Sequence, residues 1–208
     1  MMTQTIRTIA GIAPVVHADP AATALVLIDF QNEYYDGKLP LPDGLPAARN
    51  AARLLAWADR LGMPVFHVQH VGAANGALFA AGSHAAQIHP LLAPAPDHHV
   101  VTKDRVASFA GTDLHAQLQA LGVHTLVVAG LMTHMCVSTA VREARSFGAG
   151  SYRVLVAADA CATRDIADWQ GGVVAHADLH RATLTALHDN FADVRSTGAI
   201  LELPVVAN

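Results

Sequence analysis

Short and almost uninterrupted apolar runs recur along the chain, and no other feature constrains the fold as much. Five of them lie at residues 24–28, 64–68, 99–102, 125–129 and 153–157, and a shorter sixth run lies near Val194. Strands that are covered on both faces of a parallel sheet have this continuous apolar pattern, whereas half-exposed strands alternate. The runs therefore predict the strands of a buried parallel sheet.

Segments with apolar residues at helical spacing separate most of these runs, at residues 45–61, 112–121, 137–147 and 173–191. The first segment stops at a glycine that is soon followed by a proline, a common end signal for a helix. Strands and helices that alternate in this way favour right-handed βαβ units. We expect an α/β fold, a single three-layer α-β-α Rossmann-like domain over residues 1–208 with a mostly parallel sheet of about six strands. Its core would span 24–201, after an N-terminal extension at 1–20.

Composition excludes several classes of protein. The 208 residues are 52% hydrophobic and 14% charged, with a formal net charge of −4 and no cluster of Lys and Arg, so we expect no nucleic-acid partner. No apolar run reaches the ~18 to 20 residues of a membrane span, and the N-terminus lacks the layout of a signal peptide. With only Cys136 and Cys161 as cysteines, we expect a cytoplasmic protein that does not bind a membrane.

The absence of common cofactor motifs is also informative. The chain has no GxGxxG after its first predicted strand, no GxxxxGK[ST] and no GxSxG. These motifs bind dinucleotides, bind phosphates and present a serine nucleophile, respectively. We therefore expect no cofactor.

Three reactive side chains follow three separate predicted strands. Asp29 ends the first run, Lys103 follows the third, and Cys136 follows the fourth at the start of a predicted helix. Each alone has a structural explanation, as a helix cap, a solvated charge or a core thiol. The carboxyl ends of parallel strands meet at one edge, where ligands bind. A cation and a helix N-terminus favour a reactive thiolate, and a carboxylate can accept and return its proton.

The sequence resembles the isochorismatase-like cysteine hydrolases, a family that includes nicotinamidases and N-carbamoylsarcosine amidohydrolase. The resemblance runs from about residue 24 to 201 and rests on ALVLIDFQNEYY, VTKDRVASFAGTDL, VVAGLMTHMCVSTAVREA and VLVAADACATRD. It implies that Cys136 is the nucleophile, Asp29 the general base and Lys103 an electrostatic support. It also implies a cis peptide bond at 131–132, with the backbone N–H groups of Met132 and Cys136 forming an oxyanion hole.

Four further residues are expected at the substrate pocket. The resemblance implies that Gln31 and Tyr34 line it beside the catalytic carboxylate, and that Phe109 forms a wall. His134, two residues before the predicted nucleophile, is close enough in sequence to reach the pocket.

The thirteen histidines raise the question of a metal. Nicotinamidases bind one through an Asp-x-His pair just after the second strand and further His in the following loop. Here the sequence reads His67-Val-Gln-His70, with Leu78 where a later ligand is expected. We therefore expect no metal, which also disfavours nicotinamidase activity.

These features predict a cofactor-independent hydrolase that cleaves a small amide or ureido C–N bond. One alternative is a vinyl-ether hydrolase of the isochorismatase kind, which does not need the thiol. Another is a non-catalytic binding or scaffold protein on the same fold. The connection at residues 72–97, rich in Gly, Ala and Pro but poor in charge, favours a small neutral or weakly anionic substrate. Together with the high apolar content, it predicts a homo-oligomer, a dimer or larger.

Overall fold

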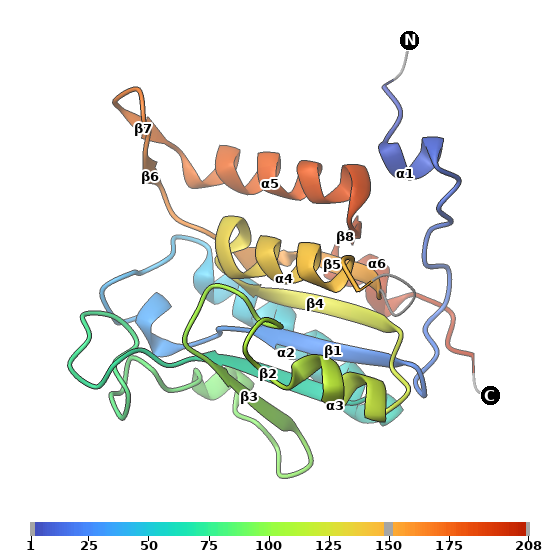
Figure 1. Ribbon diagram of the computed structural model, residues 1–208, viewed down its shortest axis with the longest axis horizontal. Helices are drawn as coiled ribbons and strands as arrows, with labels where there is room; N and C mark the ends of the chain where they lie inside the picture. The colour runs from blue at the N-terminus through green and yellow to red at the C-terminus, as the bar shows by residue number, and fades with distance from the viewer. Residues whose placement is uncertain (1–2, 148–151, 207–208) are drawn as a thin grey trace.

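The computed structural model describes residues 3–147 and 152–206, and Figure 1 shows their arrangement. Within them, one six-stranded sheet has the order β3-β2-β1-β4-β5-β8, and all its strand pairs are parallel. Its strands are β1 (Thr23–Ile28), β2 (Val65–His70), β3 (His99–Lys103), β4 (Thr125–Leu131), β5 (Arg153–Ala162) and β8 (Asp193–Arg195). The predicted α/β fold with a parallel sheet of six strands is confirmed.

Helices cover both faces of the sheet and complete the three layers. One face packs against α2 (Gly44–Leu61) and α6 (Thr197–Leu201). The other packs against α3 (Leu114–Ala120), α4 (Ser138–Ala144) and α5 (His176–Asn190). Each of the four predicted helices therefore exists, with bounds that differ by a few residues.

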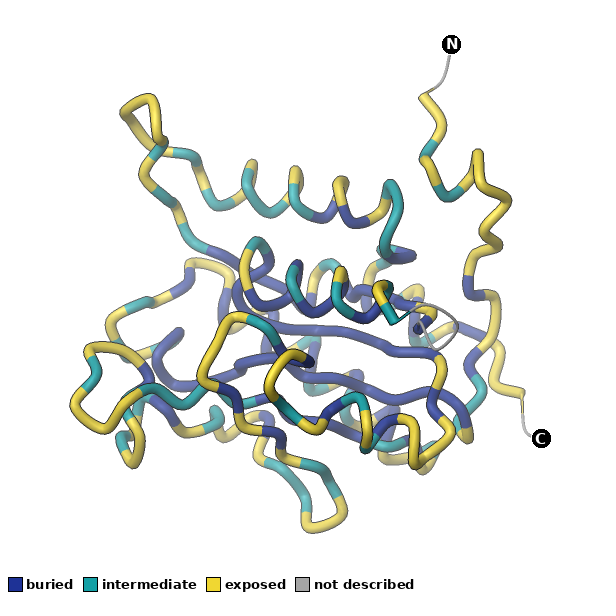
Figure 2. The backbone as a smooth tube through the Cα atoms, viewed as in Figure 1, coloured by how far each residue is buried: buried dark blue, intermediate teal, exposed yellow. Residues whose placement is uncertain are grey.

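Strand β1 explains why its sequence is continuously apolar. Leu25 and Leu27 belong to the core cluster on one face, and Val26 and Ile28 belong to the cluster on the other. Figure 2 shows the same central strands as buried along their length. Removing apolar surface from water stabilises a fold by about 25 cal/mol per Å², so the burial of both faces stabilises the sheet.

The helix predicted at 173–191 begins later than expected. Its first residues instead form β7 (Val173–Val174), which pairs antiparallel with β6 (Ile166–Ala167). Gly171 and Gly172, both at φ +95°, turn the chain between these strands, a conformation that glycine adopts without steric cost. The two valines are β-branched and therefore suit a strand better than a helix.

The N-terminal extension packs against the edge of the sheet that ends in β8. It contains α1 (Ile6–Ile9), which lies beside the end of α5 in Figure 1. The N–H of Val15 donates to Asp193 Oδ2 at 3.1 Å, and Arg153 Nη2 donates to the Pro14 carbonyl at 3.0 Å. The assignment of the whole chain to one domain stays a prediction.

No helix among the described residues combines the length and the apolar character needed to cross a membrane.

Candidate active site

The three reactive side chains meet at the carboxyl edge of the sheet. Asp29 directly follows β1, Lys103 ends β3, and Cys136 lies in the π-helical turn η3 (Thr133–Val137) after β4. Lys103 Nζ lies 2.8 Å from Asp29 Oδ2 and 3.3 Å from Cys136 Sγ. None of the three residues is more than 6% exposed. One ammonium therefore contacts both the carboxylate and the thiol in a site that is nearly closed to water.

A histidine that the sequence analysis left outside the site contacts this ammonium. Because β2 lies between β3 and β1, Lys103 crosses the end of β2 to reach Asp29. His70 ends β2, and its Nδ1 lies 3.4 Å from Lys103 Nζ, while the Arg105 carbonyl accepts from Nζ at 3.0 Å. Burial, followed by the Lys103 charge, lowers the pKa of His70, which favours a neutral ring beside the ammonium. Its place at a strand end is the signal that could have identified it.

The carboxylate leaves its strand through an unusual backbone conformation. Asp29 has φ +54°, a left-handed conformation that costs most residues roughly 1–2 kcal/mol but that Asp tolerates comparatively well. Its N–H still bonds the Val68 carbonyl at 2.8 Å, and its own carbonyl accepts the Gln31 N–H at 2.8 Å. The chain therefore turns sharply at Asp29 and places its carboxylate at the sheet edge.

Tight packing positions the turn that carries the thiol. The 131–132 peptide bond is cis, at the position that the resemblance implied. A Cβ added at Gly130 would lie only 2.7 Å from the Ile28 carbonyl oxygen, so a glycine is needed where β4 approaches β1. Beyond the cis bond, the buried Thr133 shares a hydrogen bond of 2.9 Å with His180 Nδ1 of α5. The turn is thus fixed between the sheet and the helix above it.

Burial keeps the thiol protonated in the resting site. Burial, reinforced by the Asp29 carboxylate, raises the pKa of Cys136 to about 12, although Lys103 opposes this. Burial therefore outweighs the effect of the Lys103 charge, which favours the thiolate, and Asp29 is left to accept the thiol proton during attack. Burial also raises the pKa of Asp29 against the attraction of Lys103. Burial works to lower the pKa of Lys103, but attraction to Asp29 and Cys136 outweighs it and raises that pKa.

Gln31 connects the site to the long connection at 72–97. Its Nε2 donates to the carbonyls of His70 and Ala86, both at 2.7 Å, and its Oε1 accepts the His70 N–H at 2.8 Å. Both N–H donors of the amide are then occupied by backbone. Gln31 also forms a β-bridge with Ile88. It thus anchors the connection beside the site, and its predicted contact with substrate stays a prediction.

Phe109 lies in an aromatic cluster. Its ring centroid is 5.4 Å from that of Phe147 and 6.0 Å from that of Tyr152. The backbone N–H groups of residues 108–110 donate to the Glu143 carboxylate of α4 at 3.0 to 3.2 Å. These contacts of Phe109 are structural, and its role as a pocket wall stays a prediction.

Sequence reasoning missed a cation near Tyr34 and His134. Arg164 follows β5 at the same carboxyl edge, and its Nε is buried without a hydrogen-bond partner among the described residues. Burial and the charge of Asp29 raise the pKa of Tyr34, which Arg164 opposes. Burial and then Arg164 lower the pKa of His134, whose Nδ1 lies 2.6 Å from Thr163 Oγ1. The position of Arg164 after a predicted strand could have revealed it.

Comparison with known proteins identifies the family. The Isochorismatase domain matches residues 23–199. The chain belongs to the isochorismatase family. It is 40% identical over 182 residues to the uncharacterized isochorismatase family protein YddQ of Bacillus subtilis, covering 86% of this chain and 99% of that protein. It is 36% identical over 143 residues to a streptothricin hydrolase of Streptomyces noursei, covering 69% of this chain and 50% of that protein. The crystal structure of an isochorismatase from Pseudomonas putida is 37% identical with a TM-score of 0.88, covering 96% of this chain and 100% of that one.

The histidines at the nicotinamidase metal position do not fit a shared ion in this isochorismatase-family chain. His67 and His70 stand three residues apart in β2, so their side chains point to opposite faces. His67 Nε2 lies 3.1 Å from His98 Nδ1, whereas His70 faces Lys103. In the part of the chain that the structure describes, no group of three or more His, Cys, Asp or Glu side chains is arranged to hold a metal.

Proposed function

We propose that this isochorismatase-family hydrolase is a cofactor-independent cysteine hydrolase that cleaves a small amide or ureido C–N bond. The observation that carries the proposal is the ammonium of Lys103, which lies 2.8 Å from the Asp29 carboxylate and 3.3 Å from the Cys136 sulfur. Such a buried arrangement of nucleophile, base and cation is what acyl transfer through a thioester requires.

In the first half-reaction, Cys136 Sγ attacks the carbonyl carbon while Asp29 accepts the thiol proton. Lys103 donates to the sulfur at 3.3 Å and lies 2.8 Å from Asp29 Oδ2, and the charge of Asp29 raises the pKa of Cys136, which supports a proton transfer between these two groups during attack. The carbonyl π electrons move to oxygen, and the N–H groups of Met132 and Cys136 are the proposed donors to that oxyanion. When the C–N bond breaks, Asp29 returns the proton to the leaving nitrogen.

In the second half-reaction, water replaces the leaving amine. Asp29, again ionised, accepts a proton from water as its oxygen attacks the thioester carbon. The C–S bond then breaks, the carboxylic or carbamic acid leaves, and the proton returns to the sulfur of Cys136. The enzyme ends as it began, with one water consumed and no cofactor needed.

Arg164 indicates which small substrates fit best. Its Nε is buried without a hydrogen-bond partner among the described residues, and its charge acts on Tyr34 and His134, which supports a cation near the proposed pocket. A carboxylate on the substrate would satisfy this guanidinium. We therefore propose that the enzyme prefers weakly anionic amides, and expect Arg164→Gln to raise KM for these more than for neutral amides of equal size. An equal rise in KM for both would refute this preference.

The competing functions make different demands on the thiol. A vinyl-ether hydrolase of the isochorismatase kind would not need a contact between Cys136 and Lys103. A scaffold protein would need none of the buried side chains of Asp29, Lys103 and Cys136. Retaining a buried ammonium and carboxylate without a function is costly, because each charge loses its hydration on folding. The contact of Lys103 with both partners therefore supports the cysteine hydrolase.

The deciding experiment compares two cysteine variants in a panel of small amides, with ammonia release as the readout. Cys136→Ser is expected to abolish turnover, because its hydroxyl ionises far less readily than a thiol and Asp29 is too weak a base to compensate. Cys161→Ser is the matched control, since Cys161 is also buried in the same core cluster but lies within β5, where it pairs with Gly130 of β4. Circular dichroism confirms folding. Wild-type kcat in Cys136→Ser together with loss of kcat in Asp29→Asn would refute covalent catalysis and favour the vinyl-ether reaction.

We also propose that the protein acts as a homo-oligomer in the cytoplasm. In support of association, the hairpin of β6 and β7 carries Trp169 at 89% and Val173 at 68% exposure, surface that a monomer would leave in water. Sedimentation is expected to show a species heavier than the 21.8 kDa chain at micromolar concentration. A 21.8 kDa species alone would refute the association.

A further inference from the structure

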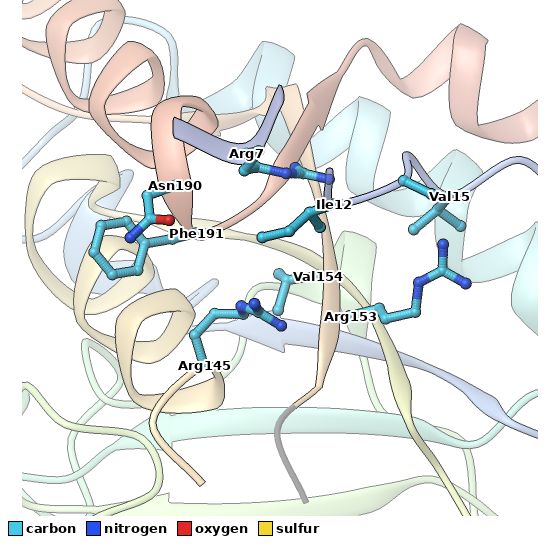
Figure 3. A pocket seen from close by; sticks show the side chains of 9 residues that line it. Arg7, Ile12, Val15, Arg145, Arg153, Val154, Asn190 and Phe191 are labelled. Carbon is cyan, nitrogen blue, oxygen red and sulfur yellow. The ribbon is translucent and has the colours of Figure 1, made fainter. Parts of the chain in front are cut away.

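A small cavity lies at the amino edge of the sheet, at the opposite end of the strands from the proposed active site (Figure 3). The N-terminal extension, the end of α4, the start of β5 and the end of α5 surround it. Its volume is about 20 Å³, above the ~10–15 Å³ that one water needs. The space therefore holds about one oxygen atom of a small anion, whose other atoms would extend through its open side.

The polar lining of this cavity is almost entirely cationic. Arg7, Arg145 and Arg153 line it, and in Figure 3 the first two extend toward the space from opposite sides. Within residues 3–147 and 152–206, none of the three has a carboxylate within 4.0 Å. The nearby Asp193 is already engaged by Arg195 at 2.7 Å and by a backbone N–H. In the described part of the chain, Arg7, Arg145 and the exposed Arg153 thus gather with no carboxylate in direct contact, in a chain whose formal net charge is −4.

The hydrogen-bonding capacity of the cluster is also unfilled. Arg145 Nη1 donates to the Tyr152 carbonyl at 3.2 Å, and Arg153 Nη2 donates to the Pro14 carbonyl at 3.0 Å. Arg7 Nη1 is buried and has no partner among the described residues. A guanidinium carries five N–H donors, so most of the donors in this cluster are not engaged by the protein.

Electrostatics agree with this geometry. Burial lowers the pKa of Arg7; Asp193 opposes this, and the charges of Arg145, Arg153 and Arg195 add to the lowering. A bound anion would act in the same direction as Asp193 and offset the charges of the neighbouring arginines, because it would supply an acceptor and a negative charge.

We propose that this cavity binds one oxyanion group, a phosphate or a carboxylate, between Arg7 and Arg145. The planar fork of a guanidinium matches the oxygens of both groups, and two forks facing one space favour an anion with several acceptor oxygens. Ile12, Val154 and Phe191 complete the lining and form an apolar floor that strengthens charge-assisted hydrogen bonds by excluding water. The bound anion links the N-terminal extension, which carries Arg7, to the end of α4, which carries Arg145.

The site is independent of the proposed catalysis. Arg145 follows the C-terminal end of α4, whereas Cys136 precedes the N-terminal end of that helix, and Arg153 begins β5 at the edge far from Asp29. The anion is therefore expected to stabilise the docked extension without taking part in the reaction.

The test measures the thermal unfolding of the full chain while inorganic phosphate is titrated at constant ionic strength, with NaCl as the balancing salt. The wild type is expected to show a saturable rise in Tm, about 3 to 6 °C when phosphate is ten times Kd. Acetate titrated in the same way distinguishes the two sources of oxyanion: a stronger response to phosphate assigns a phosphoryl ligand, and a stronger response to acetate assigns a carboxylate.

Variants locate the response. Arg7→Gln and Arg145→Gln are each expected to weaken binding at least tenfold, because each loses a charge-assisted pair. Arg49→Gln, which removes an exposed arginine from α2 on the other face of the sheet, is the matched control and should respond like the wild type. Circular dichroism checks each fold, and the second cavity variant keeps the test decisive if the first does not fold. A wild-type response no greater than that to NaCl, or an unchanged response in the folded cavity variants, would overturn the proposal.

Discussion

The buried ion pair between Lys103 and Asp29 allows stability and catalysis to be separated by a double-mutant cycle. Their side chains are 1% and 0% exposed and 2.8 Å apart. Replacing only one partner leaves an uncompensated charge in the interior, which costs about 3–5 kcal/mol. Asp29→Asn and Lys103→Met are therefore each expected to lower the free energy of unfolding by about 3–5 kcal/mol.

The double variant removes both charges together. If the two losses were independent, they would sum to about 6–10 kcal/mol. Instead, the main remaining defect is the Arg105 carbonyl, which loses the donor that Lys103 supplied at 3.0 Å, at a cost of about 1–3 kcal/mol. The expected coupling between the substitutions is therefore at least about 3 kcal/mol, while all three variants lack hydrolase activity.

Urea unfolding at pH 7.5, followed by circular dichroism, measures the four free energies of the cycle. The exposed pair of Asp178 and Arg181, 3.3 Å apart, provides the control cycle, and its coupling should lie within about 0–1 kcal/mol. If the double variant of Asp29 and Lys103 lost the full additive sum, the two charges would not compensate one another. The site would then not be balanced in charge.

Three further predictions follow from the same structure. The charge of Asp29 helps to raise the pKa of Cys136, so Asp29→Asn should speed the alkylation of Cys136 by iodoacetamide at pH 7 while abolishing turnover. Mass spectrometry measures the alkylation rate, and a rate slower than that of the wild type would contradict this prediction. Burial lowers the pKa of His67 to about 4, below the ~6.5 of an unfolded His. The contribution of neutral His67 to the free energy of unfolding is therefore fully present above pH 6.5, and about 3 kcal/mol of it is lost as the pH falls toward 4. The free energy of unfolding, measured in urea from pH 6.5 to 4, should therefore fall less steeply with pH in His67→Gln than in the wild type. Equal slopes would show that His67 is not the source of the acid sensitivity. Glu143→Gln weakens the acceptor of three N–H groups at residues 108–110 and should cost about 1–3 kcal/mol of unfolding free energy; a change below 0.5 kcal/mol would refute this anchor.

The sheet could be predicted because the apolar runs that form its strands are short, local features of the sequence. A strand buried on both faces must be apolar at every position, and residues 24–28 and 125–129 show this without reference to the rest of the chain. The late start of α5 was not foreseen, because Val173 and Val174 also fit a helical stripe. Only their pairing with β6 shows that they form a strand.

The sequence predicted those residues of the candidate site that directly follow a predicted strand and carry a reactive group. Asp29, Lys103 and Cys136 were assigned from their positions after predicted strands, and the structure places them together. His70 and Arg164 occupy equivalent positions, but the order of strands in the sheet, which decides what Lys103 crosses, is not readable from spacing. The path of residues 72–97 depends on long-range bonds between side chains and backbone, and these leave no sequence pattern.

The burial of the thiol, which cannot be read from a motif, explains why a lysine lies at the centre of the site. Before attack, the negative charge is on Asp29 and the thiol is neutral; after the proton transfers, the charge is on the sulfur and Asp29 is neutral. Lys103 lies 2.8 Å from the first position and 3.3 Å from the second, so the site carries one cation and one anion in both states. A buried environment strongly opposes an uncompensated charge, but it opposes this transfer far less, because the anion moves between two partners of the same cation. Burial thus suppresses side reactions of the thiol at rest and still permits the proton transfer that accompanies attack.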